Sequence, residues 1–194
     1  MEKVSYALGL SLGNNLLSSG VAALDYAQLA KGIQDVMEQK QPDMSYQEAQ
    51  TVINNFFQSL QAKAGEQAQS EGIAFLEENG KRAGVVTLAS GLQYEIITKG
   101  AGETPKASDT VKVHYHGTLI DGNVFDSSVS RGEPATFGVT QVISGWVEAL
   151  QLMPVGSKWK LFIPSELAYG AQGAGQAIAP HSTLVFEVEL LDIV

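Results

Sequence analysis

The sequence predicts an α+β protein with an N-terminal all-α part and a C-terminal antiparallel sheet. Apolar residues recur at helical spacing as far as Asn79, and beyond that residue they alternate with polar ones. No proline interrupts the chain between Ser45 and Pro105, so one long helix can form there. We therefore expect a helical domain with a long connecting helix in residues 1–83, and a sheet domain in residues 84–194.

Two helices are indicated before Ser45. The first carries an apolar stripe of residues four apart, namely Val4, Leu8, Leu12 and Leu16. It should end near Gly20, because glycine is unfavourable within a helix. A second helix should begin after Asp25, because the Asp25 carboxylate can cap it. Gln28, three residues later, has the spacing of a capping box.

A third helix is predicted from Tyr46 to Asn79. Ser45 and Glu48 have the spacing of a capping box at its start. Its 34 residues would span roughly 50 Å, which suggests a spacer. The first half carries an apolar stripe, whereas residues 61–71 are almost entirely polar or alanine and contain a helix-weakening glycine, Gly65. We expect that second half to be solvated and to bend or fray.

The three N-terminal helices carry more apolar surface than they can bury on one another. A second copy of the same surfaces is the simplest cover, so we predict a symmetric homodimer through residues 1 to about 60. The alternative is a small monomeric three-helix bundle.

Antiparallel strands are indicated after the helices. Apolar residues alternate at Leu92–Ile96, Val111–Tyr115 and Leu184–Leu190. Turn residues separate these strands, as at Asp121-Gly122. The only helix-like segment is Gly145–Leu152, so the pattern predicts a half-barrel sheet wrapped on one short helix.

Composition excludes several classes of protein. The net charge is −9 and acidic residues exceed basic ones in both parts, which argues against nucleic acid as a partner. Cysteine is absent, so no thiolate nucleophile or disulfide framework exists. No apolar run is long enough for a membrane span, and the start lacks a secretory pattern. We expect a cytoplasmic protein; a periplasmic or outer-membrane-associated one is the alternative if a signal peptide has been removed.

Three long motifs of mixed composition resemble the FKBP family of peptidyl-prolyl isomerases. They are VHYHGTLIDGNVFDSS from Val113, VISGWVEALQLMPVGSKWKLFIP from Val142, and LAYG with APHSTLVFEVELL from Leu167 onward. The N-terminal part, from Ser5 to Asn79, is similar to the helical extension of dimeric bacterial FKBP proteins, including the macrophage infectivity potentiator type.

The resemblance implies an isomerase that rotates X-Pro bonds in unfolded or partly folded polypeptides, with chaperone-like holding by the dimer. Rotation breaks no covalent bond, so neither a metal nor a cofactor is required. The positions that match the family's catalytic cradle are Tyr115, Phe125, Asp126, Trp146, Tyr169 and Phe186. Further substrate-binding positions are Arg131, Phe137, Val142, Ile143, Ile178 and His181.

The matching positions also suggest individual roles. Trp146 would be the floor under a pyrrolidine ring, while the Tyr169 phenol and the Ile143 backbone N–H would donate to a substrate carbonyl. Asp126 would orient Tyr115 or Arg131 rather than attack the substrate.

Three alanines depart from the family's usual pocket rim: Ala135 replaces an aromatic residue, Ala174 replaces a histidine found in some relatives, and Ala177 replaces a larger aliphatic one. Macrolide inhibitors of the rapamycin type are implied as ligands by the family. The trimmed rim leaves their affinity, and the preference for the residue before proline, unspecified.

Other functions compete with this interpretation. The same cradle could hold proline peptides without accelerating their rotation, or the dimer could act only as a holdase chaperone. His114 and His116 share one strand face, but a metal site would need a third ligand that the sequence does not indicate. The glycines from Gly170 to Gly175 lack dinucleotide-loop spacing and predict a flexible flap over the pocket.

Overall fold

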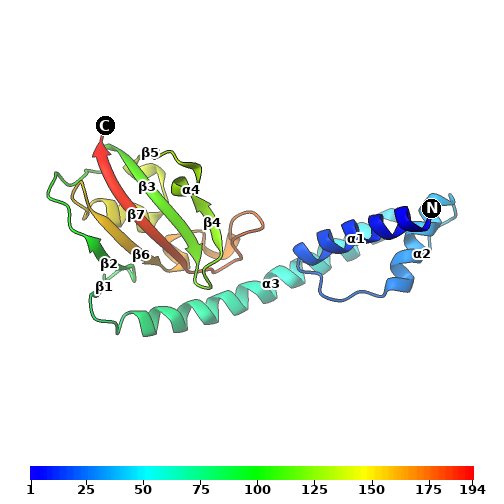
Figure 1. Cartoon of the computed structure of the whole chain (residues 1–194). Helices are drawn as coiled ribbons and strands as arrows, with labels where there is room; N and C mark the ends of the chain where they lie inside the picture. The colour runs from blue at the N-terminus through cyan, green and yellow to red at the C-terminus, as the bar shows by residue number, and fades with distance from the viewer. The chain divides into compact units, whose positions relative to one another are not determined.

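The computed structural model describes residues 1–194 and confirms the α+β class (Figure 1). Five α-helices form: α1 (Glu2–Ser18), α2 (Tyr26–Met37), α3 (Tyr46–Asn79), α4 (Ser128–Arg131) and α5 (Ser144–Leu150). Seven strands form: β1 (Val85–Thr87), β2 (Gln93–Thr98), β3 (Thr110–Leu119), β4 (Val124–Ser127), β5 (Ala135–Gly138), β6 (Lys158–Ile163) and β7 (Leu184–Ile193). No helix combines the length and apolar character that crossing a membrane requires.

The chain divides into two compact units, Met1–Leu60 and Gln61–Val194. This division falls within α3, because the second half of that helix packs on the sheet unit. The domain boundary expected between residues 83 and 84 was placed at the change in secondary structure, and it stays a prediction.

Both predicted helix caps form in the N-terminal unit. The Asp25 carboxylate accepts hydrogen bonds from the backbone N–H groups of Ala27 and Gln28, at 2.9 and 3.1 Å. The Ser45 N–H donates to Glu48 at 2.8 Å, while the Glu48 N–H donates to Ser45 Oγ at 3.2 Å. These bonds satisfy N–H groups that have no partner within the helix, so they set where α2 and α3 begin.

The apolar stripe of the N-terminal unit is largely uncovered within one chain. Helix α1 has no buried residue, and Leu8 keeps 67% of its surface exposed. Beside α1 lies an apolar groove of about 370 Å³, lined by residues that include Leu16, Leu24 and Ile33.

The second half of α3 is mostly exposed, as expected, since nine of residues 61–71 are exposed, but the expectation that it bends or frays is wrong. The helix runs unbroken, and its three buried residues, Gly65, Gly72 and Asn79, stand seven residues apart. Seven residues are close to two helical turns, so the three lie on one face. A polar helix with glycine at the contact points can approach another segment closely because no side chain intervenes. Composition alone therefore indicated the exposed side of this half correctly but missed its one packed face.

The sheet is antiparallel, with strand order β1-β2-β6-β7-β3-β4 and with β5 paired to β3 (Figure 1). The long central pair β3 and β7 runs in register from Val111 opposite Ile193 to Leu119 opposite Leu184, with one irregularity. Inward-facing residues of both strands are buried, as the alternation predicted. They form one core with the apolar side of α5, including Trp146 and Leu150. The predicted packing of the sheet on a short helix is confirmed for α5, whereas α4 is a second short helix that the sequence did not predict.

Candidate functional site

An open cavity of about 490 Å³ lies between the short helix α5 and the neighbouring strands of the sheet unit. Its lining is mostly aromatic and aliphatic: Tyr115, Phe125, Asp126, Phe137, Gln141, Val142, Ile143, Trp146, Tyr169 and Phe186. Strands β3, β4, β5 and β7 each contribute at least one of these side chains. A rigid sheet therefore positions most of the lining.

Trp146 is the centre of the aromatic cluster. It is only 4% exposed, and its ring meets those of Tyr115, Phe137 and Phe186 edge to face, with centroids 5.5, 6.0 and 5.3 Å apart. Edge-to-face contacts are a favoured geometry for aromatic pairs. The indole is thus held in one orientation from three sides.

A glycine on β3 makes room for two walls of the cavity. A Cβ atom at Gly117 would lie 2.7 Å from the Phe186 ring and 2.9 Å from the Phe125 ring. Both distances are shorter than real carbon contacts allow. The edge-to-face pair that Phe125 and Phe186 form at 5.4 Å therefore depends on this missing side chain.

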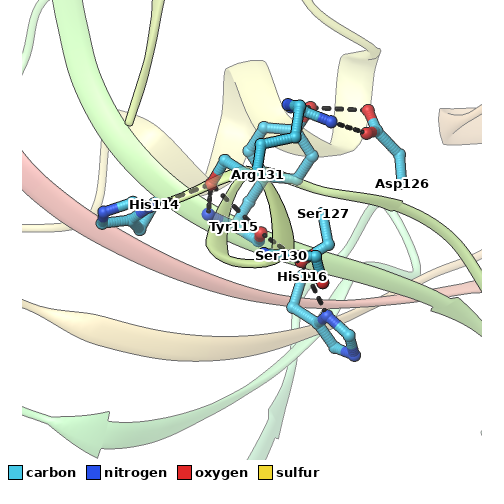
Figure 2. Close-up of polar contacts among 8 residues, drawn as sticks. His114, Tyr115, His116, Asp126, Ser127, Ser130 and Arg131 are labelled. Carbon is cyan, nitrogen blue, oxygen red and sulfur yellow. Dashed lines mark hydrogen bonds and ion pairs between the residues drawn. The ribbon is translucent and has the colours of Figure 1, made fainter. Parts of the chain in front are cut away.

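A polar triad borders the cavity (Figure 2). The Tyr115 hydroxyl donates to Asp126 Oδ2 at 2.5 Å, and the Arg131 guanidinium donates to Tyr115 Oη at 2.8 Å and to the second oxygen of Asp126. The arginine also lies over the Tyr115 ring, with Cζ 5.6 Å from its centroid. The predicted contacts of Asp126 with Tyr115 and Arg131 are therefore present.

The triad shifts the pKa values of its members. Partial burial acts to raise the pKa of Asp126, but the hydrogen bonds from Tyr115 and Arg131 and the arginine charge lower it below the ordinary carboxyl value. Burial raises the pKa of the Tyr115 phenol, and the hydrogen bond to Asp126 raises it further. At neutral pH the triad therefore holds a carboxylate, a neutral phenol and a guanidinium.

Two serines that sequence reasoning missed fix the backbone of Tyr115. The buried Ser128 hydroxyl accepts the Tyr115 N–H at 2.7 Å, donates to the Tyr115 carbonyl at 3.2 Å, and lies 3.1 Å from His114 Nδ1. Ser127 Oγ lies 2.9 Å from His116 Nδ1 and caps α4 by accepting the Ser130 N–H at 3.1 Å (Figure 2). His114 and His116 thus contact the serines that support Tyr115.

The Tyr169 hydroxyl and the Ile143 backbone N–H are two donors in the lining without a partner within the chain, and the buried Trp146 Nε1 is a third. The Tyr169 hydroxyl makes no hydrogen bond, and this side chain is 40% exposed. The backbone N–H of Ile143, just before α5, also donates to no protein group. Both groups are available to a bound carbonyl.

Of the twelve residues predicted from the sequence, nine line the cavity, and the three others lie beside it or behind it. Arg131 contacts the cavity through the triad, Ile178 is buried in the core, and His181 lies in the segment between η3 (Gly170–Gln172) and β7. Gln141 lines the cavity but was not predicted. Its position at the end of the short helix η1 (Val139–Gln141), directly before Val142, is the signal that could have found it.

Two family models match the chain. The model described as FKBP-type peptidyl-prolyl cis-trans isomerase matches residues 101–191. The model described as the domain amino terminal to FKBP-type peptidyl-prolyl isomerase matches residues 1–96. Together they account for both parts of the sequence.

Whole-chain relatives agree with these matches. The FKBP-type 22 kDa peptidyl-prolyl cis-trans isomerase of Escherichia coli is 50% identical, with 98% of this chain and 94% of the relative covered. The outer membrane protein MIP of Legionella longbeachae is 45% identical, with 99% and 85% covered. The crystal structure of FkpA from Escherichia coli has a TM-score of 0.76 and 43% identity, with 98% and 95% of the two chains covered. The chain belongs to the FKBP-type peptidyl-prolyl cis-trans isomerases.

Proposed function

We propose that this isomerase binds the proline of its substrate in the cavity above Trp146. Its substrates would be proline-containing segments of unfolded or partly folded polypeptides. The observation that carries the proposal is that one cavity collects all six residues predicted to be catalytic, together with the unpartnered Tyr169 hydroxyl and Ile143 N–H. An apolar cradle with few polar groups is the usual form of a small-ligand site.

The physical requirement is to lower the barrier to rotation about the X-Pro bond. That barrier is roughly 18 to 20 kcal/mol, because amide resonance is lost in the twisted state. An apolar cavity excludes water from the amide, and the planar form, which is the more polar one, loses more by that exclusion. Lowering the barrier by about 5 to 7 kcal/mol would accelerate rotation by roughly ten-thousand- to hundred-thousand-fold.

The individual roles follow from position. Trp146 would carry the pyrrolidine ring, with Phe125, Val142 and Phe186 as walls. The Tyr169 phenol and the Ile143 N–H would hold substrate carbonyls, which fixes the chain on either side of the rotating bond. Asp126 and Arg131 would position Tyr115 through the triad, since their opposite charges are paired with each other.

The test of the site is the cis-to-trans relaxation of a short Leu-Pro peptide, with catalytic amounts of the full chain and of variants. Tyr169→Phe removes only the hydroxyl, and Asp126→Ala removes the centre of the triad. Reduced turnover in both folded variants is expected. If neither variant lowers turnover, these assignments are wrong.

We also propose that two chains associate through residues 1 to about 60. The support is the uncovered apolar stripe of α1 and the apolar groove beside it, because exposed patches of this kind mark interaction surfaces. Two isomerase units in one particle would raise the effective concentration of a second site on the same substrate chain. Chaperone-like holding of folding intermediates follows from that arrangement.

The compartment and the inhibitors stay proposals as well. The Legionella longbeachae relative is named an outer membrane protein, which supports the periplasmic or outer-membrane-associated alternative over a cytoplasmic location. Rapamycin-type macrolides would enter the same cavity, and displacement of the Leu-Pro peptide by such a macrolide tests this directly.

A further inference from the structure

The second half of α3 touches the segment that carries Tyr169. We call that segment, residues 168–183, the flap. A Cβ atom at Gly65 would lie 3.0 Å from Pro180 Cβ, and one at Gly72 would overlap Thr183 Oγ1 and lie 3.1 Å from Thr183 Cβ. Pro180 and Thr183 form the end of the flap that returns to β7. The two glycines of the helix therefore lie where it meets the flap.

A short path joins these contacts to the cavity. The His181 N–H, next to Pro180, donates to the Gly170 carbonyl at 2.8 Å, and Gly170 directly follows Tyr169. His181 has a φ of 59°, which a non-glycine residue rarely adopts, so the turn is held by its surroundings. A displacement of Pro180 would be passed through this bond to the backbone beside Tyr169.

Contacts within the flap join its two ends, although the sequence predicted a flexible segment at Gly170–Gly175. Ala174 and Ile178 bridge each other, and the Ser182 hydroxyl donates to the Ala179 carbonyl at 2.8 Å. Ile178 is buried in the core. The segment is thus cross-linked by its own hydrogen bonds between its two ends.

The helix is fixed against the sheet at its other end. Asn79 Nδ2 donates to Gln93 Oε1 at 2.8 Å, and Gln93 Nε2 donates to the Leu76 carbonyl at 2.9 Å. The Phe75 and Phe162 rings pack with centroids 5.9 Å apart. These contacts hold the axis of α3 in place, so the space at Gly65 and Gly72 is set by the helix backbone itself.

Glycine weakens a helix relative to alanine, and helix α3 contains glycine only where it contacts the flap. We propose that Gly65 and Gly72 are positioning residues for the reaction: they let α3 support the flap at Pro180 and Thr183 and thereby set the place of the Tyr169 phenol in the cavity. The inference rests on the proposed role of Tyr169 in substrate binding.

The test introduces Gly72→Ala into the full chain and measures kcat and KM for a Leu-Pro peptide, together with the NMR shifts of the Tyr169 ring. Alanine raises helix propensity but displaces Thr183. We expect a moved Tyr169 signal and a kcat/KM lower by about tenfold, since a misplacement of about 1 Å at a reacting centre can cost more than this. Unchanged Tyr169 shifts and unchanged kinetics would overturn the inference.

Rescue separates positioning from general damage. Adding Thr183→Ala to Gly72→Ala removes the overlapping hydroxyl, and it should restore most of the Tyr169 signal and of kcat/KM. Failure of this rescue in a folded double variant contradicts the inference. The matched control is Ser70→Ala, an exposed position on the same helix, which should alter neither readout.

Two further variants separate a failure of the positioning role from a failure of the proposed function. Gly65→Ala meets Pro180 at a contact distance that a small shift can relieve, so it should give a weaker version of the same effect if Gly72→Ala does not fold. Tyr169→Phe, measured in parallel, tests the proposed function alone. If it leaves turnover unchanged while Gly72→Ala moves the Tyr169 signal, the role of Tyr169 is wrong but the contact between helix and flap stands.

Discussion

The N-terminal unit and the isomerase unit use apolar residues of the same kind with opposite results. In the isomerase unit, alternating residues of β3 and β7 are buried in one core with α5. In the N-terminal unit, apolar residues at helical spacing leave α1 without a single buried position. The comparison teaches that periodicity identifies which face of an element must be covered, whereas the covering partner has to come from elsewhere in the chain or from a second chain.

The largest effect is expected from removing a large side chain from the core of the isomerase unit, residues Gln61–Val194. We expect Trp146→Ala to destabilise that unit by about 3 to 5 kcal/mol, because the indole is enclosed by three aromatic rings. Isomerase activity should be lost in the fraction that remains folded. Urea unfolding followed by circular dichroism measures the first effect. The matched substitution is Phe57→Ala, at a residue that is exposed in the single chain. It should lower the free energy of unfolding by a similar amount only if a second chain covers Phe57.

The second way to sharpen this comparison is to place a charge on the uncovered face. Leu8→Glu should weaken self-association by about 2 kcal/mol or more, because a charge buried in an apolar interface loses its hydration. Sedimentation of the full chain should then show smaller particles at equal concentration. Asn14→Glu, on the other side of α1, is the control and should leave the sedimentation unchanged. A wild-type chain that sediments as a monomer would refute the proposed dimer and favour the three-helix bundle.

A smaller effect concerns the donor in the cavity. Tyr169→Phe should lower kcat/KM by up to about tenfold, which corresponds to the loss of one hydrogen bond of ordinary strength. Thermal stability should stay the same, because the hydroxyl makes no bond within the chain. The Leu-Pro peptide assay provides the rate, and a thermal melt provides the control.

The smallest effect is the pH dependence of the triad. Since the pKa of Asp126 is lowered on folding, its interaction stabilises the protein at neutral pH and is lost as pH falls through the folded value, below about 4. Solvent screens this half-exposed group, so the effect should be modest. Stability of the wild type should fall more steeply than that of Asp126→Asn over this range, as measured by urea unfolding at each pH. Parallel curves would contradict the assignment.

Local features of the fold were predictable from local signals. The caps at Asp25 and Ser45 depend on residues three positions apart, and the alternation in β3 and β7 depends on neighbours two apart. The cavity residues came from long motifs that resemble a known family, because periodicity alone would place Trp146 or Phe186 simply in a core. Gln141 and the serines beside Tyr115 were missed, since a polar residue in a turn carries no local mark of its partner.

The amino-acid sequence by itself determined the class of the fold, the beginnings of the helices, the faces of the strands and the protein family, because each depends on short-range spacing or on continuous motifs. Only the tertiary structure decided that one face of the polar half of α3 is packed, and that Gly65 and Gly72 meet Pro180 and Thr183. The physical reason is that a close backbone approach needs the absence of a side chain. A glycine in a polar stretch indicates such an approach and a weak helix equally well until the opposing segment, more than a hundred residues away, is in place.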